Sequence, residues 1–356
     1  MQEKFLMGNE AIALGALDAG VGFVSGYPGT PSTEVLETVK KYNDGSVYVE
    51  WSVNEKSAME VAAGAAYAGC RSMVTMKQVG LNVASDPLMS LAYVGVKGGM
   101  VVLVADDPGP ISSQTEQDTR TFASFAKLPV FDPSSPEEAY RMMAQAFDLS
   151  EKYATPVIVR ATTRVCHGCA TVAVQERRAV KPAQGFQRDT QRWVIFPRTS
   201  FLNHQKIETR NPAIGKELCS SPFNFIQNAA AGRRGVATHG ISYAYTAEAL
   251  SLLGVRPPLL KVGTPFPFPE DLALNFLRSV DEVLCVEELD PVIERELTYL
   301  CGKHHLPTRI LGKQTGHIPS AGENSVDAVK AALAGFLSLT PSAAPALPPP
   351  PQLPVR

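Results

Sequence analysis

Glu55 is the residue of this sequence whose type and position are best suited to chemistry. It follows the short apolar run 47–49, which predicts a strand, and it opens an Ala- and Gly-rich segment that ends near Gly69. Alanine favours helix formation, so the pattern predicts a helix with a carboxylate in its first turn. Two interpretations are open: an acid that the helix dipole stabilises, or a carboxylate presented to a ligand.

Two further loops carry polar groups at equivalent places, namely residues 27–32 and 76–82. Ligands of open α/β sheets bind where the carboxyl ends of the strands meet such loops. The Thr30 hydroxyl, the Lys77 ammonium and the Gln78 and Asn82 amides are therefore candidate binding groups. Thr30 and Asn82 have a second interpretation as helix caps. No G-x-G-x-x-G and no P-loop motif follows a predicted strand, and no Ser–His–Asp arrangement can be placed on adjoining loops.

Alternating strands and helices must position these loops, and they predict a doubly wound α/β fold. Over the first part of the chain the pattern predicts helices at 8–20, 31–42, 55–69, 82–93 and 137–153, and strands at 22–28, 47–49, 71–76, 99–105 and 156–160. The run 99–105 is continuously apolar, which is typical of a parallel sheet covered on both faces.

The same rhythm returns near Gly235 and predicts a second, smaller α/β domain. Its predicted strands are 235–238, 259–262, 282–287 and 308–311, and its predicted helices are 242–253, 269–279, 291–301 and 325–337. Between the two domains, residues 171–232 are polar and Pro-containing. We expect an ordered connector there, because Phe186, Trp193, Phe196 and Phe201 need somewhere to bury. Residues 340–356 are Pro-rich and predict an extended tail.

Composition places the chain among ordinary globular proteins. Its 356 residues are 45% hydrophobic and 19% charged, with a formal net charge of -2. Such a balance indicates no attraction to nucleic acid or to a membrane surface. The first ten residues contain no apolar signal core, and we expect a cytoplasmic location.

Six cysteines are spread along the chain, and only Cys166 and Cys169 lie close together. A metal or cluster site would need a second pair with suitable spacing, which the sequence lacks. We expect reduced thiols rather than a disulfide framework, and the role of this pair is left open.

The motifs at 27–32, 54–56, 75–82, 105–109 and 112–120 closely resemble the alpha subunit of indolepyruvate ferredoxin oxidoreductase. That family belongs to the thiamine-diphosphate-dependent 2-oxoacid:acceptor oxidoreductases. The resemblance extends through the connector and the second domain, in segments 240–243, 261–267 and 286–291, and covers about residues 7–337. It implies a pyrimidine-binding domain at 1–170, the connector at 171–232, a transketolase-C-terminal-like domain at 233–339 and the tail at 340–356.

The resemblance also implies roles for individual residues. Glu55 matches the family glutamate that bonds N1′ of the coenzyme's aminopyrimidine and so activates the thiazolium ring. Gly29, Thr30, Gln78 and Asn82 are expected to line the cofactor pocket. Thr30, Lys77, Gln78 and Arg120 are tentative substrate contacts. Many relatives carry His where this chain has Gln78, so the substrate preference of the relatives does not transfer directly.

Other polar residues of the chain have less specific interpretations. Gln114, Glu116 and Arg120 could shape the mouth of a pocket, bind a partner or form a solvated polar loop. His239, at the start of a turn in the second domain, is interpreted as structural.

The chain lacks two sequence features that the fused relatives contain. It contains neither a Gly-Asp-Gly diphosphate motif nor a cysteine series for iron–sulfur clusters. We therefore expect it to hold half of a thiamine diphosphate site. A partner subunit would carry the diphosphate-binding domain with Mg²⁺, and iron–sulfur and gamma-type subunits would carry the clusters. A natural split and a truncation are both open.

The expected reaction is oxidative decarboxylation of an aryl 2-oxoacid (indolepyruvate, phenylpyruvate or phenylglyoxylate type) to an acyl-CoA, with electrons passing to ferredoxin or a similar acceptor. The sequence identifies neither the particular 2-oxoacid, nor the acceptor, nor the subunit stoichiometry. The alternatives are a subunit of a non-oxidative 2-oxoacid decarboxylase and a non-catalytic assembly subunit.

Overall fold

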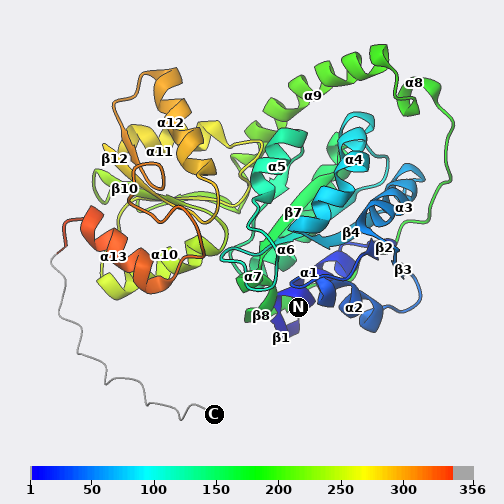
Figure 1. Ribbon diagram of the computed structural model, residues 1–356, viewed down its shortest axis with the longest axis horizontal. Coiled ribbons are helices and arrows are strands. Elements are labelled where there is room, and N and C mark those ends of the chain that lie inside the picture. Colours follow the sequence, from blue (N-terminus) through cyan, green and yellow to red (C-terminus); the bar gives the residue numbers. More distant parts are fainter. Residues whose placement is uncertain (1, 340–356) are drawn as a thin grey trace, which may run out of the picture.

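A computed structural model of the protein describes residues 2–339, and the expected Pro-rich tail lies outside this range. Two sheets, each covered by helices on both faces, lie side by side (Figure 1). The predicted α/β fold class is confirmed.

The larger sheet is six-stranded and entirely parallel. Its strands, in spatial order, are β3 (Tyr48–Trp51), β2 (Phe23–Gly26), β4 (Ser72–Lys77), β5 (Met100–Asp106), β7 (Val157–Thr162) and β6 (Val130–Phe131). Because all six strands run the same way, the loops that follow them share one edge.

Two apolar layers hold this sheet between its helices. Alternate strand residues face opposite sides, so Met73 packs into one layer and Val74 into the other. The first layer includes α1 (Gly8–Asp18), α2 (Thr33–Tyr42) and α6 (Pro136–Tyr153), and the second includes α3 (Glu55–Tyr67), α4 (Gln78–Val94) and α5 (Thr119–Ala126). The helix predicted at 82–93 begins four residues earlier, which places Gln78 and Gly80 in its first turn.

The smaller sheet has five strands, of which only β9 runs antiparallel to its neighbour. The spatial order is β13 (Arg309–Leu311), β12 (Glu282–Val286), β10 (Arg234–Thr238), β11 (Leu259–Val262) and β9 (Asn224–Gln227). One face packs against α11 (Glu270–Ser279) and α12 (Val292–His304), and the other against α10 (Gly240–Leu253) and α13 (Val326–Phe336).

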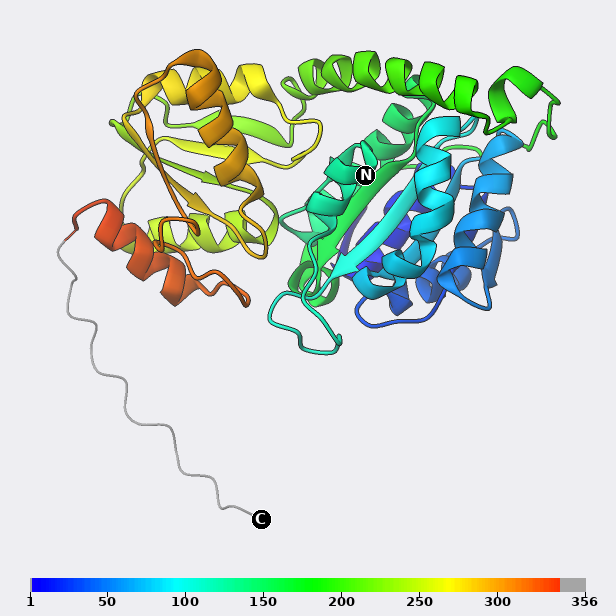
Figure 2. The ribbon, with the colours of Figure 1, turned by 45° about the horizontal axis from the view of Figure 1, so that its top comes forward.

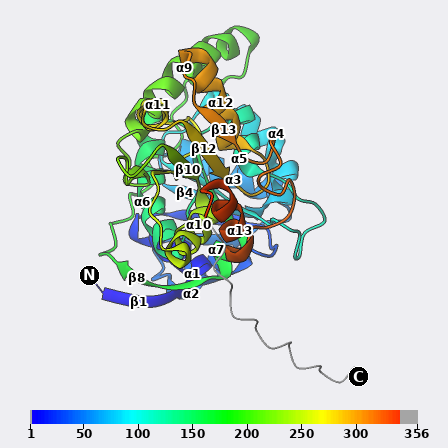
Figure 3. The ribbon, with the colours of Figure 1, turned by 90° about the vertical axis from the view of Figure 1, so that its left-hand side faces the viewer.

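A third, two-stranded sheet pairs the start of the chain with the end of the first α/β unit. β1 (Gln2–Met7) and β8 (Cys169–Val174) are antiparallel, and the short α7 (Thr163–His167) precedes β8. In Figure 3 this pair lies at the bottom of the molecule, far from α9 at the top. The sequence patterns predict neither strand.

The connector is helical where the sequence predicts only an ordered segment. It contains α8 (Thr190–Trp193) and the 22-residue α9 (Pro197–Leu218), which runs above the unit of the larger sheet and ends beside the smaller unit (Figure 2). The Trp193 ring contacts Tyr67 and Phe186. However, Phe186, Phe196 and Phe201 are each at least 60% exposed, so the expectation that they bury within this chain is wrong.

Backbone contacts join the two larger sheets directly. The amide of Val130 donates to the carbonyl of Phe266 at 2.8 Å, and that of Asp132 donates to Gly263 at the same distance. None of the helices in residues 2–339 combines the length and apolarity that a membrane crossing requires.

Candidate functional site

Glu55 lies at the amino end of α3, on the edge of the larger sheet where the strands end. Asn54 caps the helix, because its side-chain oxygen accepts from the amide of Ser57 at 2.8 Å. The Glu55 carboxylate therefore lies in the first turn, near the positive end of the helix dipole. Its side chain is half-buried and is neither sealed in the core nor fully exposed.

A glycine in the neighbouring helix makes room for this carboxyl group. A Cβ atom on Gly80 would fall 2.5 Å from Glu55 Oε1 and 2.9 Å from its Cδ. Atoms at that separation overlap, so the carboxyl group rests directly against the bare backbone of α4. The loop after β3 and the helix after β4 thus meet at one point, as the sequence predicts.

Gly29 and Lys77 form a second close contact at the same edge. A Cβ atom on Gly29 would lie 3.2 Å from Cγ and Cδ of Lys77, so the lysine stem packs over the 27–32 loop. Thr30 is exposed, and its carbonyl accepts from Ser112 Oγ at 3.4 Å. The three loops proposed from sequence are therefore contiguous, in the order Gly29, Lys77, Gly80 and Glu55.

Gln78 and Asn82 project toward the 107–118 loop. Gln78 is buried, and its Nε2 donates to the carbonyl of Thr115 at 3.1 Å. That bond identifies Oε1 as the acceptor atom, and Oε1 has no partner within the described residues. Asn82 is exposed and donates to Gln117 Oε1 at 3.1 Å. The interpretation of Asn82 as a helix cap is wrong, because Lys77 holds that position.

A cavity of about 510 Å³ lies between these amides and α5. Leu81, Phe122 and Phe125 supply apolar surface, while Glu116 and Asp118 supply acidic groups. Phe125 is 72% exposed at the rim. The cavity can therefore accept an apolar group beside hydrogen-bonding amides.

Arg120 does not face this cavity as an open binding group. Its guanidinium is fully buried. It pairs with Asp118 at 2.6 Å and Glu287 at 3.1 Å, and it donates to the carbonyls of Glu288 and Asp290. The expectation that Arg120 lies at a pocket mouth or on a solvated loop is corrected by this placement. Its tentative role as a substrate contact has no support in the geometry.

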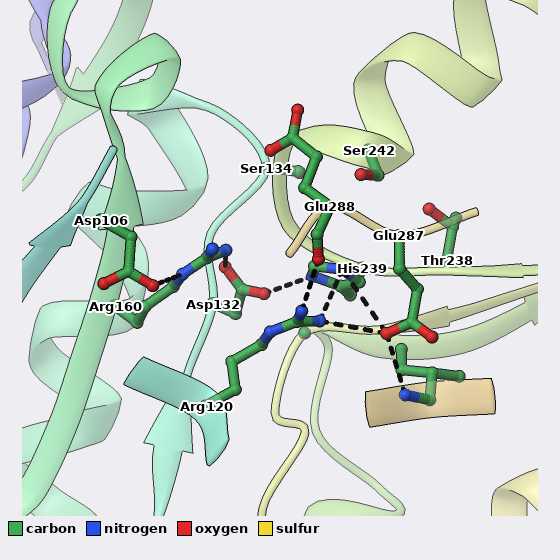
Figure 4. A network of polar contacts seen from close by, with 12 residues as sticks. Asp106, Arg120, Asp132, Ser134, Arg160, Thr238, His239, Ser242, Glu287 and Glu288 are labelled. Atoms are coloured by element: carbon green, nitrogen blue, oxygen red, sulfur yellow. Dashed lines mark hydrogen bonds and ion pairs between the residues drawn. The ribbon is translucent and has the colours of Figure 1, made fainter. Parts of the chain in front are cut away.

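His239 extends the contacts of Arg120 into a network between the two sheets (Figure 4). Its Nε2 lies 2.6 Å from Arg120 Nη1 and its Nδ1 lies 2.5 Å from Asp132 Oδ2. Because the guanidinium can only donate, Nε2 accepts and the proton resides on Nδ1. Burial, assisted by the Arg120 charge, lowers the pKa of His239 to about 4. The imidazole is therefore neutral at pH 7, in keeping with its interpretation as structural.

Arg160 completes the network on the side of the larger sheet. It pairs with Asp132 at 3.1 Å and with Asp106 at 2.8 Å. Burial raises the pKa of Asp132, but the charge of Arg160 and the hydrogen bond from His239 outweigh burial and hold that pKa well below its usual range. Sequence reasoning missed this network, because its members are scattered between residues 106 and 287 with no common spacing.

Side-chain bonds also hold the 107–118 loop in place. Asp107 Oδ2 accepts from the amides of Ile111, Ser112 and Ser113. Glu116 Oε1 accepts from Gly109 at 2.7 Å and from Gly322 at 3.0 Å, so the smaller sheet's unit contacts the loop. Gln114 remains exposed. The loop beside Gln78 is therefore ordered by both halves of the chain.

The cysteine pair forms no recognisable centre. Cys166 is buried, Cys169 is exposed, and both are free thiols. Burial raises the pKa of the Cys166 thiol, which keeps it protonated. Within residues 2–339 no group of His, Cys, Asp and Glu side chains is arranged to hold a metal ion.

Two solved structures share this architecture over 94% of the chain. One is 2-oxoglutarate:ferredoxin oxidoreductase from Magnetococcus marinus, solved with 2-oxoglutarate, coenzyme A and succinyl-CoA bound. It has a TM-score of 0.74, is 17% identical and is covered over 65% of its length. The other is a split-gene transketolase, an inactive beta4 tetramer, with a TM-score of 0.61, 14% identity and 99% of its length covered. These likenesses define the fold class.

The family follows from the sequence. The profile of the pyruvate flavodoxin/ferredoxin oxidoreductase, thiamine diphosphate-binding family matches residues 14–218. The chain belongs to this family.

Named relatives agree with this assignment. Indolepyruvate oxidoreductase subunit IorA of Methanothermobacter thermautotrophicus is 44% identical over 93% of the chain, and that of Pyrococcus abyssi is 42% identical over 95%. The matches cover 54% and 53% of those proteins, so the chain spans about half the length of these curated relatives. The resemblance predicted from the motifs is confirmed for this part.

Proposed function

We propose that this chain is the pyrimidine-binding subunit of a 2-oxoacid oxidoreductase that uses thiamine diphosphate. The observation that carries the proposal is the Glu55 carboxyl group, held half-buried against Gly80 at the strand-end edge of the larger sheet. The chemistry of the Glu55 carboxyl group also suits this role. An aminopyrimidine nitrogen requires a carboxyl group that is open to ligands and is not paired with a cation of the described residues.

The residues around Glu55 would divide the work of binding. Glu55 would hold a proton at N1′ of the pyrimidine, and Gly29 and Gln78 would border the ring. Gln78 Oε1 is a buried acceptor without a partner in the described part of this chain, so a donor supplied from outside would satisfy it. Thr30 and Lys77 would face the substrate carboxylate, and Asn82 would lie at the periphery. The bound coenzyme supplies an electron sink for the pair of electrons left when CO₂ departs.

We infer that the substrate is an aryl 2-oxoacid. The relatives named for indolepyruvate are 39–44% identical to this chain, whereas those named 2-oxoglutarate synthase subunit KorA are 25–26% identical. The products would be CO₂ and an acyl-CoA, with two electrons passing to ferredoxin or a similar carrier. The diphosphate, Mg²⁺ and iron–sulfur clusters would be held by partner chains.

Reconstitution tests the proposal. The chain is mixed with a candidate partner that carries a diphosphate-binding domain, and thiamine diphosphate, Mg²⁺ and CoA are supplied. Reduction of a viologen dye is then followed with indolepyruvate, phenylpyruvate, phenylglyoxylate and 2-oxoglutarate. We expect the aryl acids to give the higher kcat/KM and Glu55→Ala to lose at least about 100-fold.

Three results would contradict the proposal. Full activity of Glu55→Ala would remove the assigned role of the carboxyl group. Aldehyde formation without dye reduction would indicate a non-oxidative decarboxylase. Activity that survives replacement of all three loops would indicate an assembly subunit.

A further inference from the structure

A second cavity lies at the opposite edge of the larger sheet from Glu55. Its volume is about 610 Å³, and it is bounded by the last residues of α4 and α6 and by α8 and α9. Helices α4 and α6 end where β5 and β7 are about to begin, so the cavity faces the amino ends of the strands. It is therefore separate from the candidate coenzyme site.

The side chains that line this cavity carry an excess of positive charge. Lys152, Arg192, Lys206 and Arg210 are the basic residues, and Asp189 is the one acidic residue of the lining. Asp189 already accepts from the amides of Gln191 and Arg192, at 2.9 and 3.2 Å, as the cap of α8. Its Oδ1 atom is thus occupied by backbone donors, and the lining keeps an excess of positive charge.

Three of the four cations have no acidic partner within the described residues. Lys152 pairs with Glu217 at 2.6 Å. Arg192, Lys206 and Arg210 form no ion pair there, and the side-chain partners of Lys206 and Arg210 are the neutral amides of Asn203 and Asn211. Many guanidinium N–H donors in the cavity are therefore unused, because each arginine has five.

Arg210 is the most unusual of the three. Its Nε donates to Asn211 Oδ1 at 3.2 Å and its Nη2 donates to the carbonyl of Lys127 at 3.3 Å, and no carboxylate of the described residues compensates its charge. Burial lowers the pKa of Arg210 to about 10. A guanidinium partly withdrawn from water without a counter-charge is unfavourable, and an anion in the cavity would relieve that cost.

Arg192 is positioned by neutral contacts that leave its charge available. Its Nη2 donates to the carbonyl of Val96 at 2.7 Å, and its guanidinium lies 4.4 Å from the centre of the Trp193 ring. Stacking on an indole orients the planar fork without neutralising it. The rings of Tyr93 and Tyr153 also border the cavity.

We propose that this cavity binds a small phosphate-bearing anion, with Arg192, Lys206 and Arg210 as its ligands. Arginine forks match phosphate oxygens in pairs, and the volume lies in the range of small-molecule sites and exceeds that of one phosphate group. Inorganic pyrophosphate, a nucleoside diphosphate and the phosphates of coenzyme A share this chemistry. The proposal does not depend on the activity proposed above.

Calorimetric titration of the isolated chain tests the site. Pyrophosphate, ADP and coenzyme A are titrated separately, with citrate as a carboxylate anion of similar charge, at low and at physiological salt. The expected result is saturable binding of at least one phosphate compound, weakened 10-fold or more in both Arg210→Gln and Lys206→Gln. Lys206 is exposed, so the second variant keeps the test valid if the first folds poorly.

The control variant is Arg256→Gln, because Arg256 is an exposed arginine outside this cavity that forms no ion pair within the described residues. The affinity of Arg256→Gln for the phosphate compounds should stay within twofold of that of the unmodified chain. The ranking of the three phosphate compounds then identifies the ligand. The proposal is overturned if no phosphate compound binds, if Arg256→Gln weakens binding as much as Arg210→Gln, or if citrate binds as tightly as pyrophosphate.

Discussion

The position of the Glu55 carboxyl group depends on the residue that faces it. Gly80 lies in the first turn of α4, where alanine would ordinarily be favoured by about 1 kcal/mol. A Cβ there would overlap Glu55 Oε1 at 2.5 Å. Gly80→Ala should therefore displace the carboxyl group while leaving folding stability unchanged or slightly raised.

We expect turnover by the reconstituted enzyme to fall by about 100-fold in Gly80→Ala, because an ångström of misplacement can cost that much. Dye reduction and thermal unfolding measure the two effects separately. Gly64→Ala is the matched control: Gly64 lies in α3, and a Cβ atom added there would meet nothing within 4 Å, so stability should rise and activity should stay. Equal activity of both variants would refute the proposed contact.

A buried glutamate near the joint between the sheets makes stability depend on pH. Burial raises the pKa of Glu288 to about 7, from 4.5 in the unfolded chain. Between these values the folded state holds a proton that the unfolded state has lost, so this stabilisation is present below pH 4.5 and is lost as pH rises to 7. At pH 8 the ionised Glu288 carboxylate lowers the free energy of unfolding by on the order of 3 kcal/mol.

Glu288→Gln should remove this dependence, because an amide oxygen can still accept from the Asn324 amide, 2.8 Å from the carboxylate. The variant should match the native chain near pH 4.5 and exceed its free energy of unfolding at pH 8. The lowered pKa of His239 has the opposite effect, because it makes the free energy of unfolding rise between pH 4 and 6.5. Comparing urea unfolding of the two chains cancels that contribution, and a difference that does not change with pH would refute the assignment.

The sequence predicts the position of a single residue well when that position depends on the local pattern of strands and helices. The order of strands and helices alone predicts that Glu55, Gly29 and Lys77 lie on adjoining loops, and the structure brings them together. Arg120 cannot be placed in this way. Its partners Glu287 and His239 lie more than 100 residues away along the chain, so only the assembled fold determines whether its charge is free or paired.

Among the elements, α5 and β12 are joined by a buried charge network. Arg120 at the start of α5 compensates both Asp118 and Glu287. Arg120→Leu would leave these carboxylates buried without their cation, and such changes cost about 3–5 kcal/mol.

The effect should appear as a lowered urea midpoint for Arg120→Leu. Lys303→Gln is the control, because Lys303 forms an exposed pair with Glu270, and exposed pairs contribute about 0–1 kcal/mol. A similar small loss for both variants would mean that the network does not stabilise the joint.

The elements missed from the sequence share a physical cause. Strands β1 and β8 pair across more than 160 residues, and the short runs that form them are not distinctive on their own. Helix α9 has an internal proline and a polar composition, so the sequence pattern did not predict a helix there. Its buried residues Ile207, Asn211, Ile214 and Leu218 nevertheless recur at helical spacing, and that signal could have found it.

For the whole molecule, the direct bonds between the sheets predict one cooperative unit. The amides of Val130 and Asp132 and the buried network all cross the joint. Scanning calorimetry should therefore give a single transition for which the calorimetric and van't Hoff enthalpies agree. Arg120→Leu should broaden or divide that transition, and two separate transitions in the unmodified chain would contradict this account.

The exposure of several apolar residues can be interpreted only from the whole molecule. Trp51, Val53, Val83 and Phe125 are each at least 40% exposed, and they belong to the elements that carry the candidate site. On the proposed function, a diphosphate-binding domain would cover part of this surface. No local pattern in the sequence distinguishes such residues from core residues.

We propose that Glu55 activates a coenzyme shared between this chain and a partner. Exchange of the proton on the thiazolium carbon of bound thiamine diphosphate, followed by NMR in deuterated water, measures that activation without turnover. We predict fast exchange in the complex of the two chains and a rate lower by about 100-fold or more in Glu55→Gln. An unchanged exchange rate in the variant, with the coenzyme still bound, would contradict the account.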